Sequence, residues 1–193
     1  MNPDFVLLNW LNQLVGKNAL LDTLALYIVN DYALPALFAF VVGALWFAGY
    51  DKAERDRCKR GVLYTALGVL IANLIVKLAW MSFFRPRPFA VLDDVKILFY
   101  RPSVSSFPSE PVATLMALAF GVWLFERRAG TVMLVLTFLF ALARVMAGVH
   151  FPSDIIAGML IGAGAVYVPF RYVPAVQRLN TRLIDLAKRF GLA

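Results

Sequence analysis

The chain has 193 residues, 61% of them hydrophobic, and a mean hydropathy of +0.73. Soluble domains are about half apolar, so this composition excludes an ordinary soluble protein and predicts one integral membrane domain over residues 1–193. The net charge of +7 would suit nucleic acid, but the basic residues cluster between apolar runs. That pattern predicts that the basic residues set the orientation of the protein in the membrane and contact anionic lipid headgroups, and that the protein does not bind nucleic acid.

The first half of the chain predicts one interfacial helix and two membrane spans. Residues 3–17 carry apolar groups at helical spacing with polar amides between them, which is typical of a helix lying in the membrane interface. The first span is expected within 22–49, with a kink at Pro35. A charged loop over 51–60 follows, and it contains the single cysteine, Cys58, so no internal disulfide is possible. The second span is expected over 61–84. No cleavable signal peptide is expected, since the N-terminus lacks a basic region.

The second half predicts three more spans. The prolines of Arg85-Pro-Arg-Pro88 end the second span, and a polar loop continues to about 107. The third span runs from Ser109-Glu-Pro111 to Phe125, because Ser109 suits an N-cap and Pro111 a first helical turn. The fourth ends near Gly148, and the fifth covers about 153–170 before a basic amphipathic tail. The expected fold is therefore all-α: a polytopic membrane helix bundle with five spans, or six if 3–20 also crosses.

Charge sets the expected orientation of these spans. Twelve of the 19 basic residues lie in three clusters, at 51–60, at 127–128 and in the tail from 171. Such clusters mark the cytoplasmic side. The loop 85–108, the start of the third span and the turn 149–153 are then all expected at the outer face of a cytoplasmic membrane.

This topology gathers candidate site residues at that outer face. Lys77, Arg85, Ser109, Arg144 and the N-terminus of the third span form a natural site for a phosphate group. Beside it lies His150, the only histidine. Asp154, four residues later, is expected to fix its tautomer, which is the arrangement of an activated nucleophile.

The motifs also resemble a known family. Lys77-x7-Arg85-Pro86, Pro108-Ser109 and Arg144-x5-His150-x3-Asp154 are similar to the three-part signature of the type 2 phosphatidic acid phosphatase superfamily, which shares a core with vanadium haloperoxidases. Within it, the small undecaprenyl pyrophosphate phosphatases of the bacitracin-resistance type are most similar.

The resemblance implies a metal-independent lipid phosphatase. It implies that His150 attacks phosphorus to form a phosphohistidine, that Asp154 orients it, and that Lys77, Arg85, Ser109 and Arg144 hold the phosphate. The implied reaction converts a lipid diphosphate, such as undecaprenyl diphosphate, to the monophosphate. No cofactor is implied. The oligomeric state is left open.

One motif departs from the family pattern. Where the family has Pro-Ser-Gly-His or Pro-Ser-Asp-His, this chain has Pro108-Ser-Glu-Pro111, so the histidine that acts as general acid is missing. Three readings stay open. Glu110 replaces the acid, or a diphosphate leaving group needs less protonation, or the protein is a catalytically weakened polyprenyl-phosphate binding or transport protein. Arg87 and Arg101 are expected at the rim, as headgroup or diphosphate contacts or as purely structural residues, and not as catalysts.

Overall fold

The computed structural model describes residues 2–190, and the regular secondary structure in this range is helical. The helices are α1 (Pro3–Asn12), α2 (Ala19–Ile28), α3 (Ala33–Leu45), α4 (Lys52–Ser82), α5 (Pro88–Val91), α6 (Glu110–Phe125), α7 (Arg127–Met146), α8 (Pro152–Tyr172) and α9 (Pro174–Arg189). The prediction of an all-helical membrane bundle is confirmed.

Helices α4, α7 and α8 are each long and apolar enough to cross a membrane. The pair α2–α3 meets the same criteria together, but the two helices bend by 49° at a short break. Helix α6 is apolar and has 16 residues. Three helices therefore meet the criteria for a span, or four if the α2–α3 pair counts as one, and the third predicted span is the shorter helix α6. The count of five spans stays a prediction. The bend lies before α3, whereas Pro35 sits in the first turn of α3.

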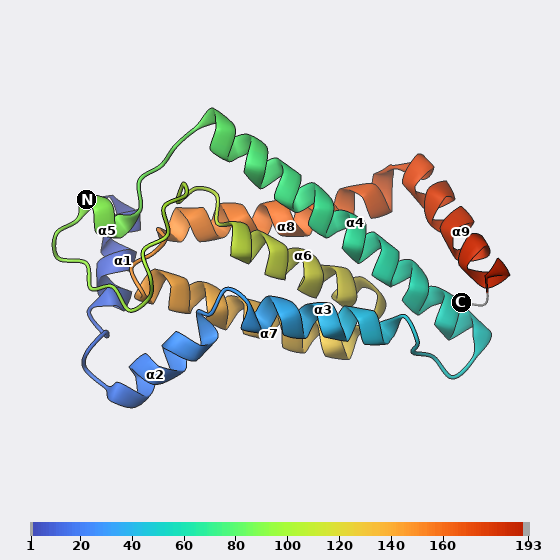
Figure 1. Ribbon diagram of the computed structural model, residues 1–193, viewed down its shortest axis with the longest axis horizontal. Coiled ribbons are helices and arrows are strands. Elements are labelled where there is room, and N and C mark those ends of the chain that lie inside the picture. The colour runs from blue at the N-terminus through green and yellow to red at the C-terminus, as the bar shows by residue number, and fades with distance from the viewer. Residues whose placement is uncertain (1, 191–193) are drawn as a thin grey trace.

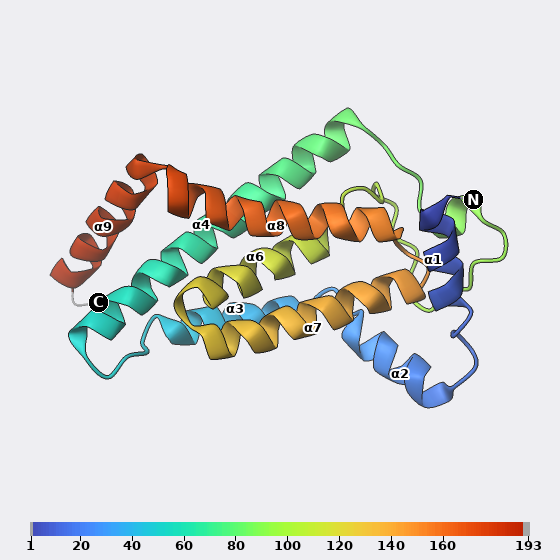
Figure 2. The same ribbon diagram turned by 180° about the vertical axis from the view of Figure 1, so that it is seen from behind.

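Helix α6 is the centre of the bundle, enclosed by α3, α4, α7 and α8 (Figures 1 and 2). Residues from several of its faces are buried, among them Val112, Leu115 and Val122. A helix that is apolar all round is stable only when other helices surround it. The main hydrophobic core, which includes Phe38, Phe140 and Phe151, accordingly forms around α6.

The expected loop at 51–60 is helical, which corrects the prediction. Helix α4 begins at Lys52, and the Asp51 side chain caps it by accepting a hydrogen bond from the Glu54 N–H at 2.8 Å. Charged side chains such as lysine, arginine and glutamate are good helix formers. The charge cluster therefore extends the membrane helix beyond its apolar part instead of interrupting it.

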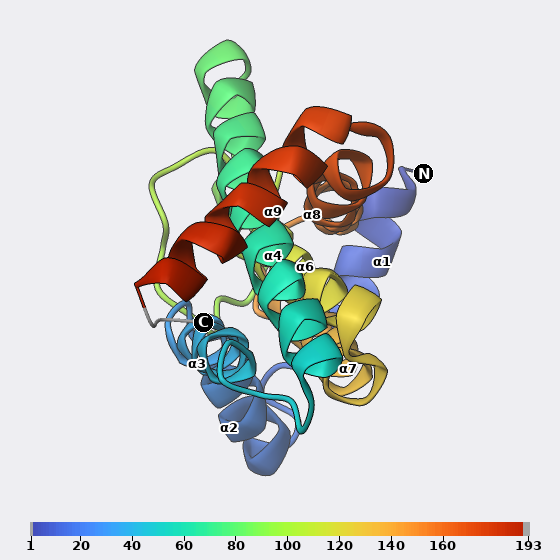
Figure 3. The same ribbon diagram turned by 90° about the vertical axis from the view of Figure 1, so that its right-hand side faces the viewer.

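The two ends of the bundle differ in chemistry. One end carries α1, α5 and the long loop 92–109, and the α7–α8 turn with His150 lies there (Figure 1). At the other end, α9 lies across the start of α4 (Figure 3). The three basic clusters belong to this second end, so the predicted separation of basic residues from His150 is present in the structure.

Candidate functional site

His150 lies in the short turn between α7 and α8 and is completely buried. Its Nδ1 atom is 3.0 Å from the Ser106 carbonyl oxygen. A carbonyl oxygen only accepts hydrogen bonds, so Nδ1 carries the proton and donates it. The other nitrogen, Nε2, then carries no proton, and its lone pair can accept a hydrogen bond.

Three donors surround this lone pair. Nε2 is 3.2 Å from Nη1 of Arg87, 3.2 Å from Nη2 of Arg144 and 3.3 Å from the Ser109 hydroxyl. Ser109 occupies the N-cap position of α6, as predicted, but its side chain makes no capping hydrogen bond and faces His150 instead. Two guanidinium groups and a hydroxyl on one nitrogen form a cluster suited to the oxygens of a phosphate.

Burial holds His150 in its neutral form. Desolvation, together with the positive charges of Arg144 and Arg87, lowers the pKa of His150 to about 4, against the opposing influence of Asp154. At neutral pH the imidazole is therefore uncharged, which is the form that can act as a nucleophile.

Arg87 is a central member of the site, which corrects the expectation that it lies at the rim. It is only 5% exposed, and it donates to the carbonyl oxygens of Val104 and Val149 at 3.1 and 2.9 Å. Burial, with Arg144 nearby, lowers the pKa of Arg87 to about 10, so it remains a cation at neutral pH. These contacts fix its guanidinium group beside Nε2 of His150.

Arg85 lies elsewhere, and its predicted place in the phosphate site is corrected. Its Nη1 is 2.5 Å from Asp154 Oδ1, and its Nη2 is 2.9 Å from Asp4 Oδ2. Both carboxylates compensate its charge. Arg85 and Arg87 each precede a proline, so the Arg-Pro dipeptide alone does not distinguish them.

Asp154 lies beside the imidazole and raises the pKa of His150, but the contact between the two side chains is long. Its carboxylate is 3.7 Å from His150 Nδ1, beyond hydrogen-bonding distance. It accepts hydrogen bonds from the Ser106 hydroxyl at 2.5 Å and the Phe151 N–H at 2.8 Å. Asp154 thus holds the Ser106 segment, whose carbonyl oxygen in turn orients the imidazole.

Lys77 is outside the site. Its side chain is exposed on α4, and it forms no ion pair or hydrogen bond with any residue in the described range 2–190. One turn further along α4, Trp80 occupies the space next to the site, and its indole N–H donates to the Pro108 carbonyl oxygen at 3.2 Å. The sequence of α4 is largely apolar around Lys77, so it does not indicate which face of the helix packs against the bundle.

A cavity of about 310 Å³ adjoins the cluster. Its wall includes both guanidinium groups, and Glu110 and Pro111 at the start of α6. His150 is not part of the wall, so Arg87 and Arg144 separate it from the cavity. Glu110, the predicted acid, therefore shares a cavity with the two arginines that contact the imidazole.

Arg144 is held by Asp31, and Asp31 in turn by Tyr100; sequence reasoning assigned neither residue to the site. Asp31, between α2 and α3, forms an ion pair with Arg144 Nη1, and it accepts a hydrogen bond from the Tyr100 hydroxyl at 2.6 Å. Burial and this bond raise the pKa of Tyr100 to about 12. Arg144 Nε is buried without a partner among the described residues, which leaves one donor for a ligand.

Comparison with known proteins identifies the family of the chain. The family model of the PAP2 superfamily matches residues 61–178. The "Bacitracin transport permease protein BcrC" of Bacillus licheniformis is 29% identical over 88% of this chain and 80% of its own length. The "Undecaprenyl-diphosphatase BcrC" of Bacillus subtilis (strain 168) is 25% identical over 80% of this chain and 76% of its own.

Two solved structures have a similar fold. LpxE of Aquifex aeolicus superimposes with a TM-score of 0.65 and 26% identity, covering 87% of this chain and 94% of its own. A transmembrane PAP2-type phosphatidylglycerolphosphate phosphatase from B. subtilis gives a TM-score of 0.64 at 18% identity. The match covers 93% of this chain and 85% of the phosphatase. The second likeness concerns the fold alone.

Proposed function

The chain belongs to the PAP2 superfamily and is a phosphatase of that membrane family, and we propose from this that it removes the terminal phosphate of a lipid diphosphate. Undecaprenyl diphosphate is the substrate we favour. One relative, 25% identical, is named an undecaprenyl-diphosphatase. The observation that carries the proposal is the neutral, buried His150 with its Nε2 between Arg87, Arg144 and the Ser109 hydroxyl.

Substrate binding exposes the nucleophile. The terminal phosphate enters the cavity, and its oxygens accept hydrogen bonds from Arg87 and Arg144, which both line the cavity. Charge-assisted bonds of this kind are stronger than the contacts of a guanidinium group with a neutral imidazole. The two arginines therefore exchange Nε2 for the phosphate, and the Nε2 lone pair becomes free to face phosphorus.

The reaction then proceeds in two displacements. Nε2 attacks the terminal phosphorus, an N–P bond forms, and the P–O bond to the lipid monophosphate breaks. Glu110 gives its proton to the departing oxygen. In the second step Glu110 takes a proton from a water molecule, the water oxygen attacks phosphorus, and the N–P bond breaks to release inorganic phosphate. The positive charges of Arg87 and Arg144 stabilise the phosphoryl oxygens in both steps.

We propose that this chemistry takes place at the outer face of the cytoplasmic membrane. The basic clusters at 51–60, at 127–128 and in α9 belong to the end of the bundle opposite His150. By the positive-inside rule this basic end faces the cytoplasm. The lipid headgroup would then reach His150 from the outer leaflet.

The test is phosphate release by the purified protein in a neutral detergent with a metal chelator present. Undecaprenyl diphosphate is compared with phosphatidic acid, and His150→Ala serves as the control. We expect turnover of the diphosphate that the control lacks. Tight binding of the diphosphate without turnover would overturn the proposal in favour of a lipid-phosphate binding or transport protein.

A further inference from the structure

A second cationic pocket lies at the end of the bundle opposite His150. Its volume is about 900 Å³, and α4, α6, α8 and α9 contribute its wall. His150 precedes the first residue of α8, and Arg171 of this pocket belongs to the last turn of the same 21-residue helix. At about 1.5 Å per residue the two sites are roughly 30 Å apart, the thickness of a bilayer core.

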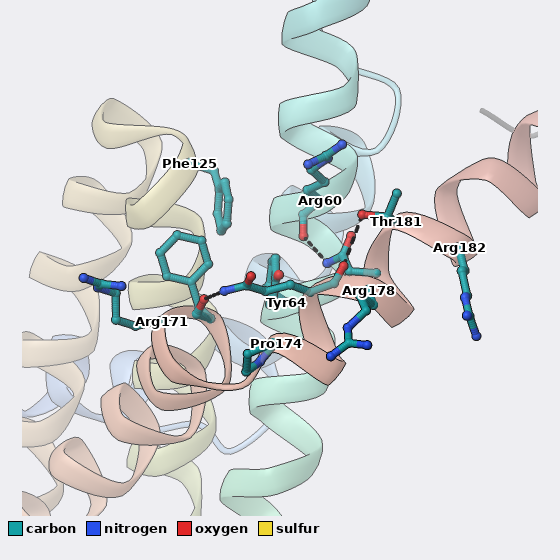
Figure 4. A pocket seen from close by; sticks show the side chains of 11 residues that line it. Arg60, Tyr64, Phe125, Arg171, Pro174, Arg178, Thr181 and Arg182 are labelled. Carbon is teal, nitrogen blue, oxygen red and sulfur yellow. Dashed lines mark hydrogen bonds between the residues drawn. The ribbon is translucent and has the colours of Figure 1, made fainter.

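The wall of the pocket combines an aromatic floor with a cationic rim (Figure 4). Tyr64, Phe125 and Phe170 pack with ring centroids 5.3 to 6.0 Å apart. Four arginines surround them: Arg60, Arg171, Arg178 and Arg182. The wall contains no carboxylate among its 11 residues.

The protein compensates little of the charge on the four guanidinium groups: Arg60 is near enough to Asp56 to lower the pKa of that carboxyl, but Asp56 is itself paired with Lys188. Within residues 2–190 none of them forms an ion pair or donates a hydrogen bond. Arg171 only stacks over Tyr172, at 5.6 Å from the ring centre. Arg178 and Arg182 lie four residues apart on α9, so two like charges share one helix face. An anion bound in the pocket would remove this repulsion.

The neighbourhood of the pocket indicates a lipid and not a soluble anion. Helix α9 has an exposed apolar stripe made by Leu179, Leu183, Leu186 and Phe190. Residues at this spacing lie along one side of a helix. A helix with such a stripe beside arginines is typical of one that lies in the membrane interface. The arginines of the pocket are thereby held at the level of lipid headgroups.

We propose that this pocket binds the phosphate headgroup of an anionic phospholipid. Arginine is suited to this role because its planar group binds phosphate oxygens in pairs. In Figure 4 the four guanidinium groups point in different directions and do not meet at one point, so the long side chains would have to turn toward a shared headgroup to bind it together. The site is separate from the catalytic one and is independent of which lipid diphosphate is hydrolysed.

The experiment is native mass spectrometry of the whole protein in neutral detergent, titrated with phosphatidylglycerol or with phosphatidylcholine. The test variant is Arg178→Gln with Arg182→Gln. The matched control is Arg128→Gln with Arg189→Gln, which removes the same charge from two exposed positions outside the pocket. All four positions are on the surface, and thermal unfolding checks that each variant is folded.

We expect the wild type and the control to retain phosphatidylglycerol in preference to phosphatidylcholine. The test variant should bind phosphatidylglycerol about 30-fold more weakly, since a basic residue at an anionic membrane surface typically contributes about 1 kcal/mol. Equal losses in the two double variants, or no loss in either, would overturn the proposal. Displacement of the lipid by millimolar inorganic phosphate would also overturn it and assign the pocket to a soluble anion.

Discussion

His150 has to be neutral to attack phosphorus, and its surroundings favour that form. Desolvation and two adjacent arginines place its pKa at about 4, below the usual 6.5. In the unfolded chain the imidazole takes up a proton near pH 6.5. The stabilisation from its neutral burial is therefore complete above that pH and is lost as the pH falls towards 4.

The single histidine makes this pKa directly measurable. With ring-labelled histidine, the NMR spectrum of the folded protein should contain one imidazole signal. We expect it to show the Nδ1–H tautomer at neutral pH and to titrate near pH 4. A midpoint between pH 6 and 7 would show that the imidazole is solvated and would contradict the geometry described above.

Arg87 should be essential because of its shape as well as its charge. Arg87→Lys keeps the cation but cannot keep both the backbone carbonyl contacts and the phosphate contact. We expect kcat/KM to fall about 100-fold, typical for the loss of one preorganised donor. Arg101→Lys is the matched control, since Arg101 is exposed in the loop that follows α5 and stacks only loosely over Phe89, at 5.8 Å. Similar losses in both variants would remove Arg87 from its assigned role.

Glu110 is the only carboxylate besides Asp31 in the wall of the catalytic cavity. If Glu110 is the acid, the variant Glu110→Gln should have a kcat lower by about 100-fold or more. Glu126→Gln, at the far end of α6, serves as control. Pro111→His in the Glu110→Gln background should recover part of the loss, because residue 111 also lines the cavity. Full activity of Glu110→Gln would mean that the diphosphate leaving group needs no acid.

The residues that the sequence identified and those it missed differ in kind. Arg144, Ser109 and His150 are tied to helix ends, so their meeting follows from topology. Asp31 meets Arg144 across 113 positions of sequence, and Ser106 orients His150 through a backbone carbonyl, which no side-chain motif encodes. Arg87 was confused with Arg85 because the two Arg-Pro pairs are equivalent in sequence. These three contacts depend on how the helices and loops pack together, which the sequence motifs do not specify.

At the scale of elements, close packing of α6 against α8 determines where Ser109 meets His150. The backbone of α6 lies against glycines of α8. A Cβ atom at Gly162 would be 2.4 Å from the Ala113 carbonyl oxygen, and one at Gly158 would be 2.7 Å from the Ser109 carbonyl oxygen. Small residues at such contacts allow helices in membranes to approach closely.

Gly162→Ala should therefore force α6 and α8 apart. We expect a loss of about 1–3 kcal/mol of stability, with a thermal unfolding midpoint several degrees lower in detergent. Gly164→Ala is the control, because its Cβ atom would meet nothing within 4 Å; it should leave the midpoint unchanged or raise it slightly. If both variants unfold like the wild type, the helices have room to adjust and the packing argument fails.

Apolar length and helix caps were enough to predict most elements. The predicted start of α6 at Ser109 holds, whereas α2 begins at Ala19, before the expected first span, after a cap by Asn18. The bend between α2 and α3 was placed at Pro35 because proline is the usual cause of kinks, but the break lies in residues 29–32. There Asn30 accepts hydrogen bonds from the N–H groups of Tyr32 and Ala33, at 2.9 and 3.0 Å. A side chain that competes for backbone donors ends one helix and begins another.

For the whole molecule, the separation of charge along the bundle was predictable, because it follows from the positions of the basic clusters between the apolar runs of the sequence. The same separation puts the proposed phosphate site around His150 at one end and the arginine pocket beside α9 at the other. The second site was not predictable. Its arginines are distributed over α4, α8 and α9, and only the fold of α9 across the bundle brings them to one pocket.

The most direct test is whether His150 carries the phosphoryl group during turnover. The protein is mixed with undecaprenyl diphosphate, quenched within one turnover under alkaline conditions and digested, and the peptide containing His150 is analysed by mass spectrometry. Because the chain has one histidine, phosphohistidine can only be His150. We predict that this adduct forms at least as fast as phosphate is released. Steady phosphate release with an unmodified His150, or an undiminished rate in His150→Ala, would contradict the mechanism.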